Sequence, residues 1–295
     1  MTPGISQKTE MLPYKVLYFL FSVKVALFTC CGPEKRRSDF EVIGGAYKIR
    51  QIATLPGEVN ESSGLAVARP GKSYWTHNDG GSKPALYEVD ARGQLLRTLD
   101  LPGLRNRDWE DLARDDQGNL YIGDFGNNSN NRRNLKIYRL HPDRPGRVDS
   151  ITFRYADQAA FPPRERERNF DCEAFFWHAD SLYLFSKNRG RKNVKMYVLP
   201  ARPGDHVAAV RGEVFIKSMV TAADVNPAHN LFAVLTYGKV LLFRLTDNGR
   251  LLKDPYLCIK VYRNQAEAIA FVNDTDFLIT NEQGKMYLVE RKGKQ

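Results

Sequence analysis

The chain has 295 residues, of which 42% are hydrophobic and 26% charged, and its formal net charge at pH 7 is +10. This composition is that of a globular protein with a sizeable core, and it excludes a disordered or low-complexity chain. The positive charge suits anionic partners, although charge alone is a weak signal.

The N-terminal region departs from this average. Met11–Thr29 is an apolar stretch interrupted by Lys15 and Lys24. Because two lysines in the middle of a bilayer would be costly, the stretch is typical of a secretory signal rather than of a stable membrane span. It ends in Leu27–Cys30, which resembles a bacterial lipoprotein box, although Thr29 is bulkier than the residue usual before the acylated cysteine.

We therefore expect a lipoprotein signal peptide over residues 1–29 and a lipid anchor on Cys30, with Cys31 as the alternative acylated residue. The protein would be exported and anchored in the periplasm or at the cell surface. An uncleaved anchor and plain secretion are the other possibilities. Export argues against nucleic acid as a partner.

Residues 30–46 are expected to form an anchor and linker. Beyond the first cysteine pair only Cys172 and Cys258 remain. Two cysteines make no disulfide framework, and their expected places on an inner and an outer strand argue against a bridge between them. The sequence thus predicts that the hydrophobic core supplies the stability.

From Tyr47 onward the hydrophobic period is two, and no amphipathic helix is evident. The expected strands form a four-strand unit that is repeated five times. The repeat is clearest in the first strand and turn of each unit, which read SGLAVARPGKSYW from Ser63, EDLARDDQGNLYI from Glu110, EAFFWHADSLYLF from Glu173, TAADVNPAHNLFAV from Thr221 and EAIAFVNDTDFLI from Glu267.

The last unit lacks a fourth strand, and the unpaired segment Tyr47–Leu55 can supply it. The pattern predicts an all-β fold over residues 47–295: a β-propeller of five four-stranded blades closed by an N-terminal strand. Six blades are the alternative. Two consecutive β-sandwich domains would explain neither the common unit nor the complementary ends.

Three motifs carry a resemblance to a known family. They are His77–Gly80 (HNDG), Asp108–Ala113 (DWEDLA) and Gly123–Asn128 (GDFGNN). With them the chain resembles a family of exported bacterial propellers of unsettled activity, in which Asp usually stands in place of Asn127. More remotely it is similar to phytase-like and lactonase-like propellers, which implies metal ions on the axis. The resemblance supports the fold and adds little chemistry.

The first strand of each blade should line the central channel. The aligned starts of these strands are Ser63, Glu110, Glu173, Thr221 and Glu267. Three carboxylates at equivalent positions repel one another and require compensation by a cation, a basic side chain or protonation. Because the donors are hard oxygens, the sequence predicts a Ca²⁺ or Mg²⁺ site made by these five residues.

The ends of the second strands and the loops that enter the first strands should reach the same face. The candidate ligand-binding residues there are Asn78, Asp79, Arg105, Trp109, Asp124, Asn127, Asn128, Lys187, Arg189, Tyr237, Asn281 and Glu282. The arginine-rich loop Arg164–Arg168 joins this rim. Asn and Asp at strand ends are also ordinary turn formers, the loop can equally be a solvated charged segment, and Trp109 can be packing.

The sequence contains no HExxH, CxxC, GxSxG or phosphate-binding glycine loop. Only His77 and Asp111 stand as candidate catalytic bases. The sequence therefore favours a non-catalytic module that binds an anionic small molecule, glycan or protein at the axial face. A divalent-metal-dependent hydrolase of phytase, lactonase or esterase type is the first alternative. A structural docking platform is the second.

Overall fold

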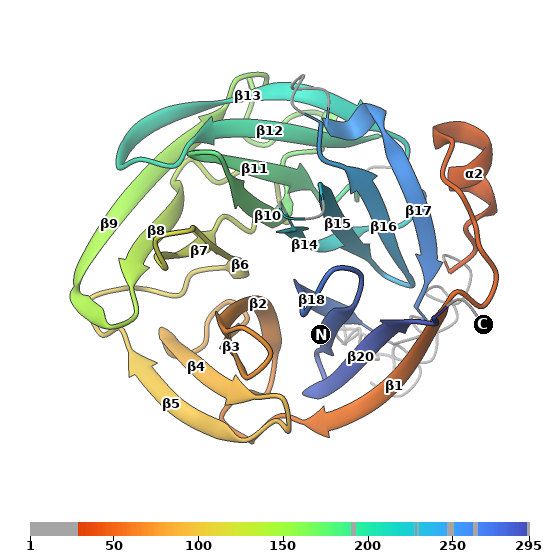
Figure 1. Cartoon of the computed structure of the whole chain (residues 1–295). Helices are drawn as coiled ribbons and strands as arrows, with labels where there is room; N and C mark the ends of the chain where they lie inside the picture. Colours follow the sequence, from red (N-terminus) through yellow and green to blue (C-terminus); the bar gives the residue numbers. More distant parts are fainter. Residues whose placement is uncertain are drawn as a thin grey trace, which may run out of the picture.

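The computed structural model describes residues 29–189, 193–226, 228, 230–246, 251–261 and 265–293. Almost all of the expected signal peptide therefore lies outside the described residues. The described part is an all-β protein with one short α-helix and two 3₁₀ turns. Its sheets are arranged around a central axis as a β-propeller (Figure 1). None of its helices is long and apolar enough to cross a membrane.

Four sheets make up the ring. One contains, in order, β2 (Ser62–Arg69), β3 (Ser73–Asn78), β4 (Ala85–Asp90) and β5 (Leu95–Asp100). A second contains β14 (Val220–Asn226), β15 (Leu231–Thr236), β16 (Lys239–Arg244) and β17 (Pro255–Lys260). A third contains β18 (Ala266–Phe271), β19 (Phe277–Asn281), β20 (Lys285–Arg291) and β1 (Tyr47–Thr54).

The fourth sheet has eight strands and consists of two antiparallel runs. The first run is β6 (Trp109–Arg114), β7 (Leu120–Asp124), β8 (Leu135–His141) and β9 (Arg144–Tyr155). The second run is β10 (Cys172–His178), β11 (Ser181–Ser186), β12 (Val194–Pro200) and β13 (Gly204–Val214). The two runs join because their last strands, β9 and β13, pair in parallel. The 3₁₀ turns are η1 (Glu165–Glu167) and η3 (Leu251–Lys253).

The N-terminal strand closes the ring as the sequence predicts. β1 pairs with β20 in antiparallel register, with Tyr47 opposite Arg291 and Thr54 opposite Lys285. The first strands β2, β6, β10, β14 and β18 contact one another around the axis. This arrangement brings their starts to one face.

The hydrophobic core is divided among the junctions between neighbouring four-strand runs. Trp75 and Leu86 pack with Trp109 and Leu120, for example, between the runs that begin with β2 and β6. Each of the other junctions of the described chain has its own cluster, and the one that contains Leu65 and Leu278 lies between the last run and the first. The aliphatic and aromatic strands of the repeat thus bury both faces of each sheet.

The segment expected to be a linker is instead packed against the ring. It contains the seven-residue helix α2 (Gly32–Ser38), and Phe40 packs edge-on against Phe243 with ring centroids 5.0 Å apart. Cys31 forms a disulfide with Cys258, whose Cα atom is 5.9 Å away, while Cys172 is free and buried. The expectation that no disulfide contributes was wrong, because Cys31 was taken only as a candidate for acylation.

Candidate functional site

A cavity of about 290 Å³ opens on the axial face where the first strands begin. Its wall contains ten of the residues that the sequence places there: Ser63, Asp79, Glu110, Asn128, Glu173, Lys187, Arg189, Tyr237, Glu267 and Glu282. Glu61, Ser62, Asp108 and Met219 complete the lining. We call this space the inner cavity.

A β-bulge explains why the aligned strand starts reach the axis. The pairing register of every first strand shifts at the position that the repeat alignment makes equivalent: Ser63, Glu110, Glu173, Thr221 and Glu267. A bulge leaves one residue unpaired and changes the direction of its side chain. The same local distortion is therefore repeated around the ring, and it turns three glutamates toward one another.

Basic and hydroxyl groups hold two of these glutamates. Lys187 Nζ donates to Glu173 Oε2, and Arg189 Nη2 lies 3.2 Å from Glu173 Oε1. Tyr237 donates its hydroxyl to Glu267 Oε1 at 2.8 Å. Lys187 is 5% exposed, so a buried cation supplies part of the compensation that the sequence demands.

Two carboxyl groups of the inner cavity, those of Glu110 and Glu267, hold protons more strongly than in water. Burial raises the pKa of Glu110 well above its ordinary value, and the negative charge of Glu173 adds to the rise. Burial also raises the pKa of Glu267, and Lys187 limits that rise. Removal from water disfavours the charged form of an acid, so the cavity favours a cation or neutral carboxyls.

One group of carboxylates is close enough to share a cation. Oxygen atoms of Asp79, Asp108 and Glu110 lie within 4.8 Å of one another. Burial raises the pKa of Asp108 to about 6, with the Asp79 charge adding to the rise and Arg132 opposing it. Only Glu110 belongs both to this group and to the predicted metal set.

Two glycines make room for this carboxylate group. A side chain at Gly126 would lie 2.0 Å from Glu110 Oε1 and 2.4 Å from Asp108 Oδ2, and one at Gly80 would lie 2.6 Å from Asp108 Oδ1. A Cβ atom at either position would force these carboxylate groups to move, so glycine allows the group its present arrangement. Gly80 of the HNDG motif and Gly126 of the GDFGNN motif thus border the acidic group.

The other predicted metal ligands differ in their surroundings. Ser63 lines the inner cavity. Thr221 does not, because it is 2% exposed and its hydroxyl donates to the carbonyl of Ala266 at 2.8 Å. That bond joins the first strands of neighbouring sheets.

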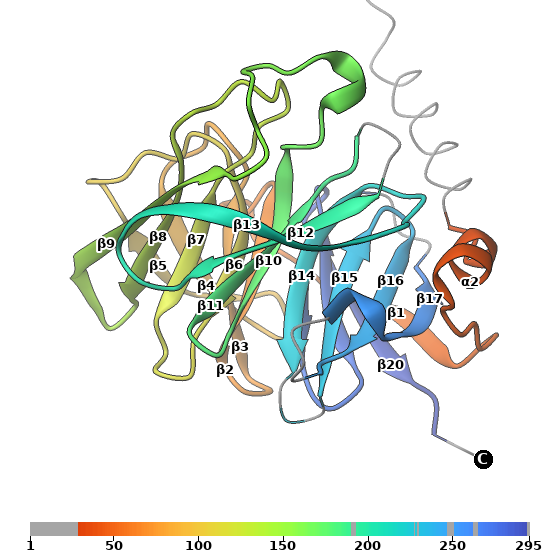
Figure 2. The same ribbon diagram turned by 90° about the horizontal axis from the view of Figure 1, so that it is seen from above.

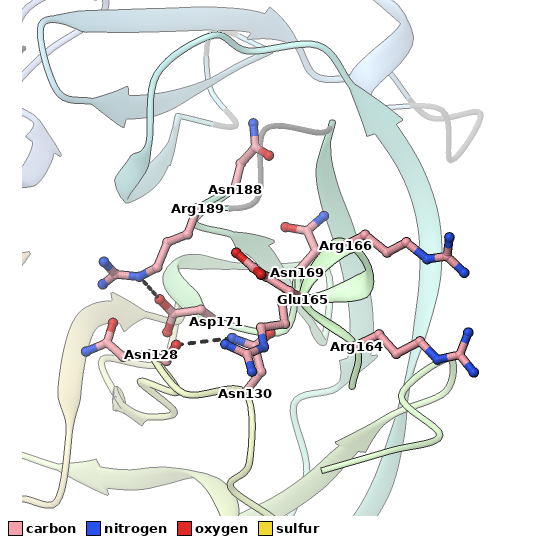
Figure 3. A pocket seen from close by; sticks show the side chains of 10 residues that line it. Asn128, Asn130, Arg164, Glu165, Arg166, Asn169, Asp171, Asn188 and Arg189 are labelled. Atoms are coloured by element: carbon pink, nitrogen blue, oxygen red, sulfur yellow. Dashed lines mark hydrogen bonds and ion pairs between the residues drawn. The ribbon is translucent and has the colours of Figure 1, made fainter. Parts of the chain in front are cut away.

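A larger cavity of about 790 Å³, which we call the outer cavity, adjoins the inner one (Figure 3). Asn128 and Arg189 line both. The remaining lining residues are Asn130, Arg164, Glu165, Arg166, Arg168, Asn169, Asp171 and Asn188. The lining contains four arginines and two acidic residues, so its formal charge is positive.

The arginines of the outer cavity differ in how firmly they are held. Arg189 Nε donates to the buried carboxylate of Asp171 at 2.5 Å, and Figure 3 shows the guanidinium directed at it. The side chains of Arg164 and Arg166 point away from Arg189 and Asp171 in Figure 3, and their loop is exposed. Within that loop Arg166 lies 3.8 Å from Glu167.

The structure does not bring the two candidate bases to either cavity. His77 and Asp111 are both 0% exposed. Burial lowers the pKa of His77, whose ring packs edge-on against Trp109 with centroids 5.6 Å apart. The carboxylate of Asp111 accepts backbone N–H groups from Leu112, Phe175 and Ala223 at 2.9–3.2 Å. Asp111 therefore links three first strands, and burial raises its pKa well above the ordinary value.

Several other candidates have structural contacts of the kind that turn formers make. The side chain of Asn78 donates to the carbonyl of Glu58 at 2.8 Å. The side-chain oxygen of Asn281 accepts the backbone N–H of Lys285 at 2.9 Å. Asn127 donates its side-chain amide to the carbonyl of Phe170 at 2.9 Å.

The remaining three candidates also lie outside the cavity walls. Asp124 is 2% exposed and pairs with Arg132 at 2.9 Å. Trp109 is 0% exposed and packs in the core. Arg105 is exposed on the loop before β6.

Two acidic residues that are not among the predicted ligands belong to the site. Asp108 belongs to the carboxylate group, and Asp171 holds Arg189 and also accepts the backbone N–H of Asn127 at 2.8 Å. Both directly precede a first strand. Each lies two residues before an aligned glutamate, and this shared position is the signal that could have assigned them to the site.

No protein-family model matches the chain, and no curated protein matches it in sequence. Among solved structures it is similar to a PQQ-bound aldose sugar dehydrogenase from Streptomyces coelicolor, with 10% identity, a TM-score of 0.47 and coverage of 82% of this chain and 97% of that one. It is also similar to virginiamycin B lyase from Staphylococcus aureus, with 11% identity, a TM-score of 0.42 and coverage of 82% and 99%. The computationally designed Ika4 protein has 14% identity, a TM-score of 0.33 and coverage of 67% and 99%.

Proposed function

We propose that this protein is an exported, lipid-anchored propeller that binds an anionic ligand at its axial face without chemical turnover. The observation that carries the proposal is the outer cavity with its four arginines. Its volume of about 790 Å³ is in the range of small-molecule sites. An acidic sugar, a phosphorylated compound or an acidic loop of a protein has the charge and size to enter it.

The proposed fold is five four-stranded blades closed by the N-terminal strand. The support is the way in which β9 and β13 join two runs of an eight-stranded sheet, so that each run keeps its own first strand at the axis. The resemblance to exported bacterial propellers, which rests on the HNDG, DWEDLA and GDFGNN motifs, is part of this proposal.

The charge distribution suggests how the ligand is oriented. Anionic groups belong in the outer cavity, because the carboxylates of the inner cavity would repel them. Arginine is suited to such groups, since its planar guanidinium can donate two parallel hydrogen bonds to a carboxylate, sulfate or phosphate. Asn128, shared by both cavities, can bond to hydroxyl groups at the boundary.

The disulfide supports the proposed location. A bond between Cys31 and Cys258 suits a protein that folds in an oxidising compartment. It also occupies Cys31, which leaves the exposed Cys30 as the proposed site of acylation. We expect Cys30→Ser to abolish fatty-acid labelling, and labelling that persists in this variant would exclude Cys30.

A metal-dependent hydrolase is the second candidate, and the carboxylate group of Asp79, Asp108 and Glu110 favours it. Clustered carboxylate oxygens suit Ca²⁺ or Mg²⁺, which could polarise a bound ester or phosphate. The burial of His77 and Asp111 away from the cavities weighs against this candidate, because it leaves no proposed base near the metal.

Retention on heparin tests the binding proposal. Replacement of Arg164, Arg166 and Arg168 by Gln should lower the salt concentration at which the protein elutes. The matched control replaces Arg144, Arg147 and Arg154, exposed on β9, and changes the net charge equally. Equal shifts in elution for the two triple variants would mean that retention on heparin depends on net charge alone. That result would contradict a binding site at the outer cavity.

A further inference from the structure

The segment that follows the apolar N-terminal stretch is held tightly on the outer wall of the ring. The Cys31–Cys258 disulfide joins it to β17. Glu34 and Lys239 form an ion pair at 2.5 Å in which both side chains are 0% exposed. A charge that is removed from water requires such a partner, so the pair fixes α2 to β16 as well.

Further contacts continue this attachment. The hydroxyl of Ser38 donates to the carbonyl of Phe215 at 2.9 Å, and the guanidinium of Arg37 lies 3.6 Å from the centre of the Phe215 ring. Lys239 Nζ also donates to the carbonyl of Cys30 at 3.5 Å. Between Cys30 and Ser38, therefore, the chain follows the surface of the ring.

The attached segment and the ring residues beside it carry a surplus of exposed positive charge. We call this surface the anchor flank, and its exposed basic residues are Lys35, Arg36, Arg37, Lys217 and Lys260. Lys217 is adjacent to α2, because its backbone N–H donates to Glu34 at 3.0 Å, and Lys260 ends β17 opposite Lys239. The exposed acidic residues of the segment are Asp39 and Glu41. Figure 2 shows α2 on the outside of the ring beside β17.

We propose that the anchor flank lies on an anionic lipid surface and holds the propeller in one orientation on the membrane. The inference rests on the proposed anchoring. The attached segment follows the apolar stretch Met11–Thr29 directly in the sequence. An acyl chain on Cys30 and an uncleaved apolar anchor both place the bilayer within a few residues of α2. Basic residues next to an anchor are attracted to anionic headgroups within a Debye length of the surface.

The tight attachment also fixes how the axial face is oriented relative to the membrane. A flexible linker would let the propeller rotate freely, whereas the disulfide and the buried ion pair transmit the orientation of α2 to the whole ring. Because α2 lies on the perimeter and not over the axis (Figure 1), the inner and outer cavities remain open to solvent when the flank rests on lipid.

Lysine footprinting of the full, membrane-extracted protein tests the proposal. The protein is reconstituted into vesicles of phosphatidylcholine, or of phosphatidylcholine mixed with phosphatidylglycerol, and treated with a water-soluble acylating reagent. On the mixed vesicles, labelling of Lys35, Lys217 and Lys260 should fall at least about fivefold relative to detergent, as expected for residues held at an anionic surface. Lys72, exposed in the turn between β2 and β3, should keep its labelling.

Two double variants test whether the protection of Lys217 depends on the basic residues of the anchor flank or only on the nearness of the bilayer. Lys35→Gln with Arg36→Gln should restore labelling of Lys217 on the mixed vesicles to the detergent level. Lys72→Gln with Arg92→Gln, an equal loss of exposed charge elsewhere, should leave Lys217 protected. If the protein binds the vesicles but its protection is equal on neutral and mixed vesicles, or absent on both, the docking proposal is wrong and the anchoring is not. A protein that does not associate with vesicles at all overturns the anchoring and the docking together.

Discussion

The inner and outer cavities adjoin each other and share Asn128 and Arg189, yet they use charge in opposite ways. In the inner cavity Glu110, Glu173 and Glu267 are at most 8% exposed. In the outer cavity the loop Arg164–Arg168 carries its charges in water. The buried charges of the inner cavity therefore contribute to the stability of the ring, whereas the exposed arginines of the outer cavity can bind a ligand with little effect on the stability of the fold.

The largest expected effect is that of removing the buried cation. Lys187→Met leaves Glu173 in a buried place without its closest partner, and breaking a buried pair in this way typically costs about 3–5 kcal/mol. We expect a loss of this size in the free energy of unfolding, measured with urea. The double variant Lys187→Met with Glu173→Gln should recover part of it. A change in Lys187→Met below about 1 kcal/mol would contradict the role given to the inner charges.

The pH dependence of stability should differ between the cavities. The pKa of Asp108 is raised to about 6 from its ordinary 3.8, so the folded state keeps a proton that the unfolded state has lost. The stability from this group is full below pH 3.8 and is lost as the pH rises to about 6. The size is about 1–2 kcal/mol after screening by solvent.

Asp108→Asn should remove this loss, and the free energy of unfolding should then change less between pH 4 and 6. Glu165→Gln in the exposed loop of the outer cavity is the matched control, and it should leave the pH profile as it is. Identical profiles for the parent and Asp108→Asn would show that Asp108 titrates normally.

A divalent cation should bind in the inner cavity and not in the outer cavity. If Ca²⁺ binds Asp79, Asp108 and Glu110, the protein should melt several degrees lower in chelator and recover with added Ca²⁺. Protons compete for the same oxygens, so the recovery should be smaller at pH 5 than at pH 7. Glu110→Gln should weaken the response. Melting curves that ignore both chelator and calcium, with no stoichiometric metal by elemental analysis, would refute the cation site.

The smallest effect on stability is expected for the outer arginines. Replacement of Arg164, Arg166 and Arg168 by Gln should change the free energy of unfolding by less than about 0.5 kcal/mol, because exposed charges contribute little. Thermal melting at two salt concentrations checks this. A loss of 2 kcal/mol or more would mean that the loop is part of the folded framework, and the contrast between the two cavities would fail.

The sequence predicts the strands and the inner cavity well because both follow from a repeated local pattern. Alternation of apolar and polar residues defines each unit, and the aligned starts Glu110, Glu173 and Glu267 prove to share a β-bulge. Pairing of Tyr47–Thr54 with the last strand follows from counting strands. Such features repeat, so one unit supports the interpretation of the next.

Contacts that occur once, between distant segments, could not be predicted in this way. Cys31 and Cys258 are 227 residues apart, and no local pattern marks them as partners. The burial of His77 depends on the packing of Trp109 from the next sheet. The approach of Asp79 to Asp108 depends on the conformations of two loops that meet only in the folded ring.

The most direct test of the account is to locate an anionic probe on the protein. A crystal soaked in sucrose octasulfate, a compact polysulfated sugar, should show the probe in the outer cavity, with sulfate oxygens within hydrogen-bonding distance of Arg189 or Arg168 and none among Glu110, Glu173 and Glu267. Density for the probe in the inner cavity, or only at a site remote from Arg189, would contradict the proposed binding of anions at the axial face.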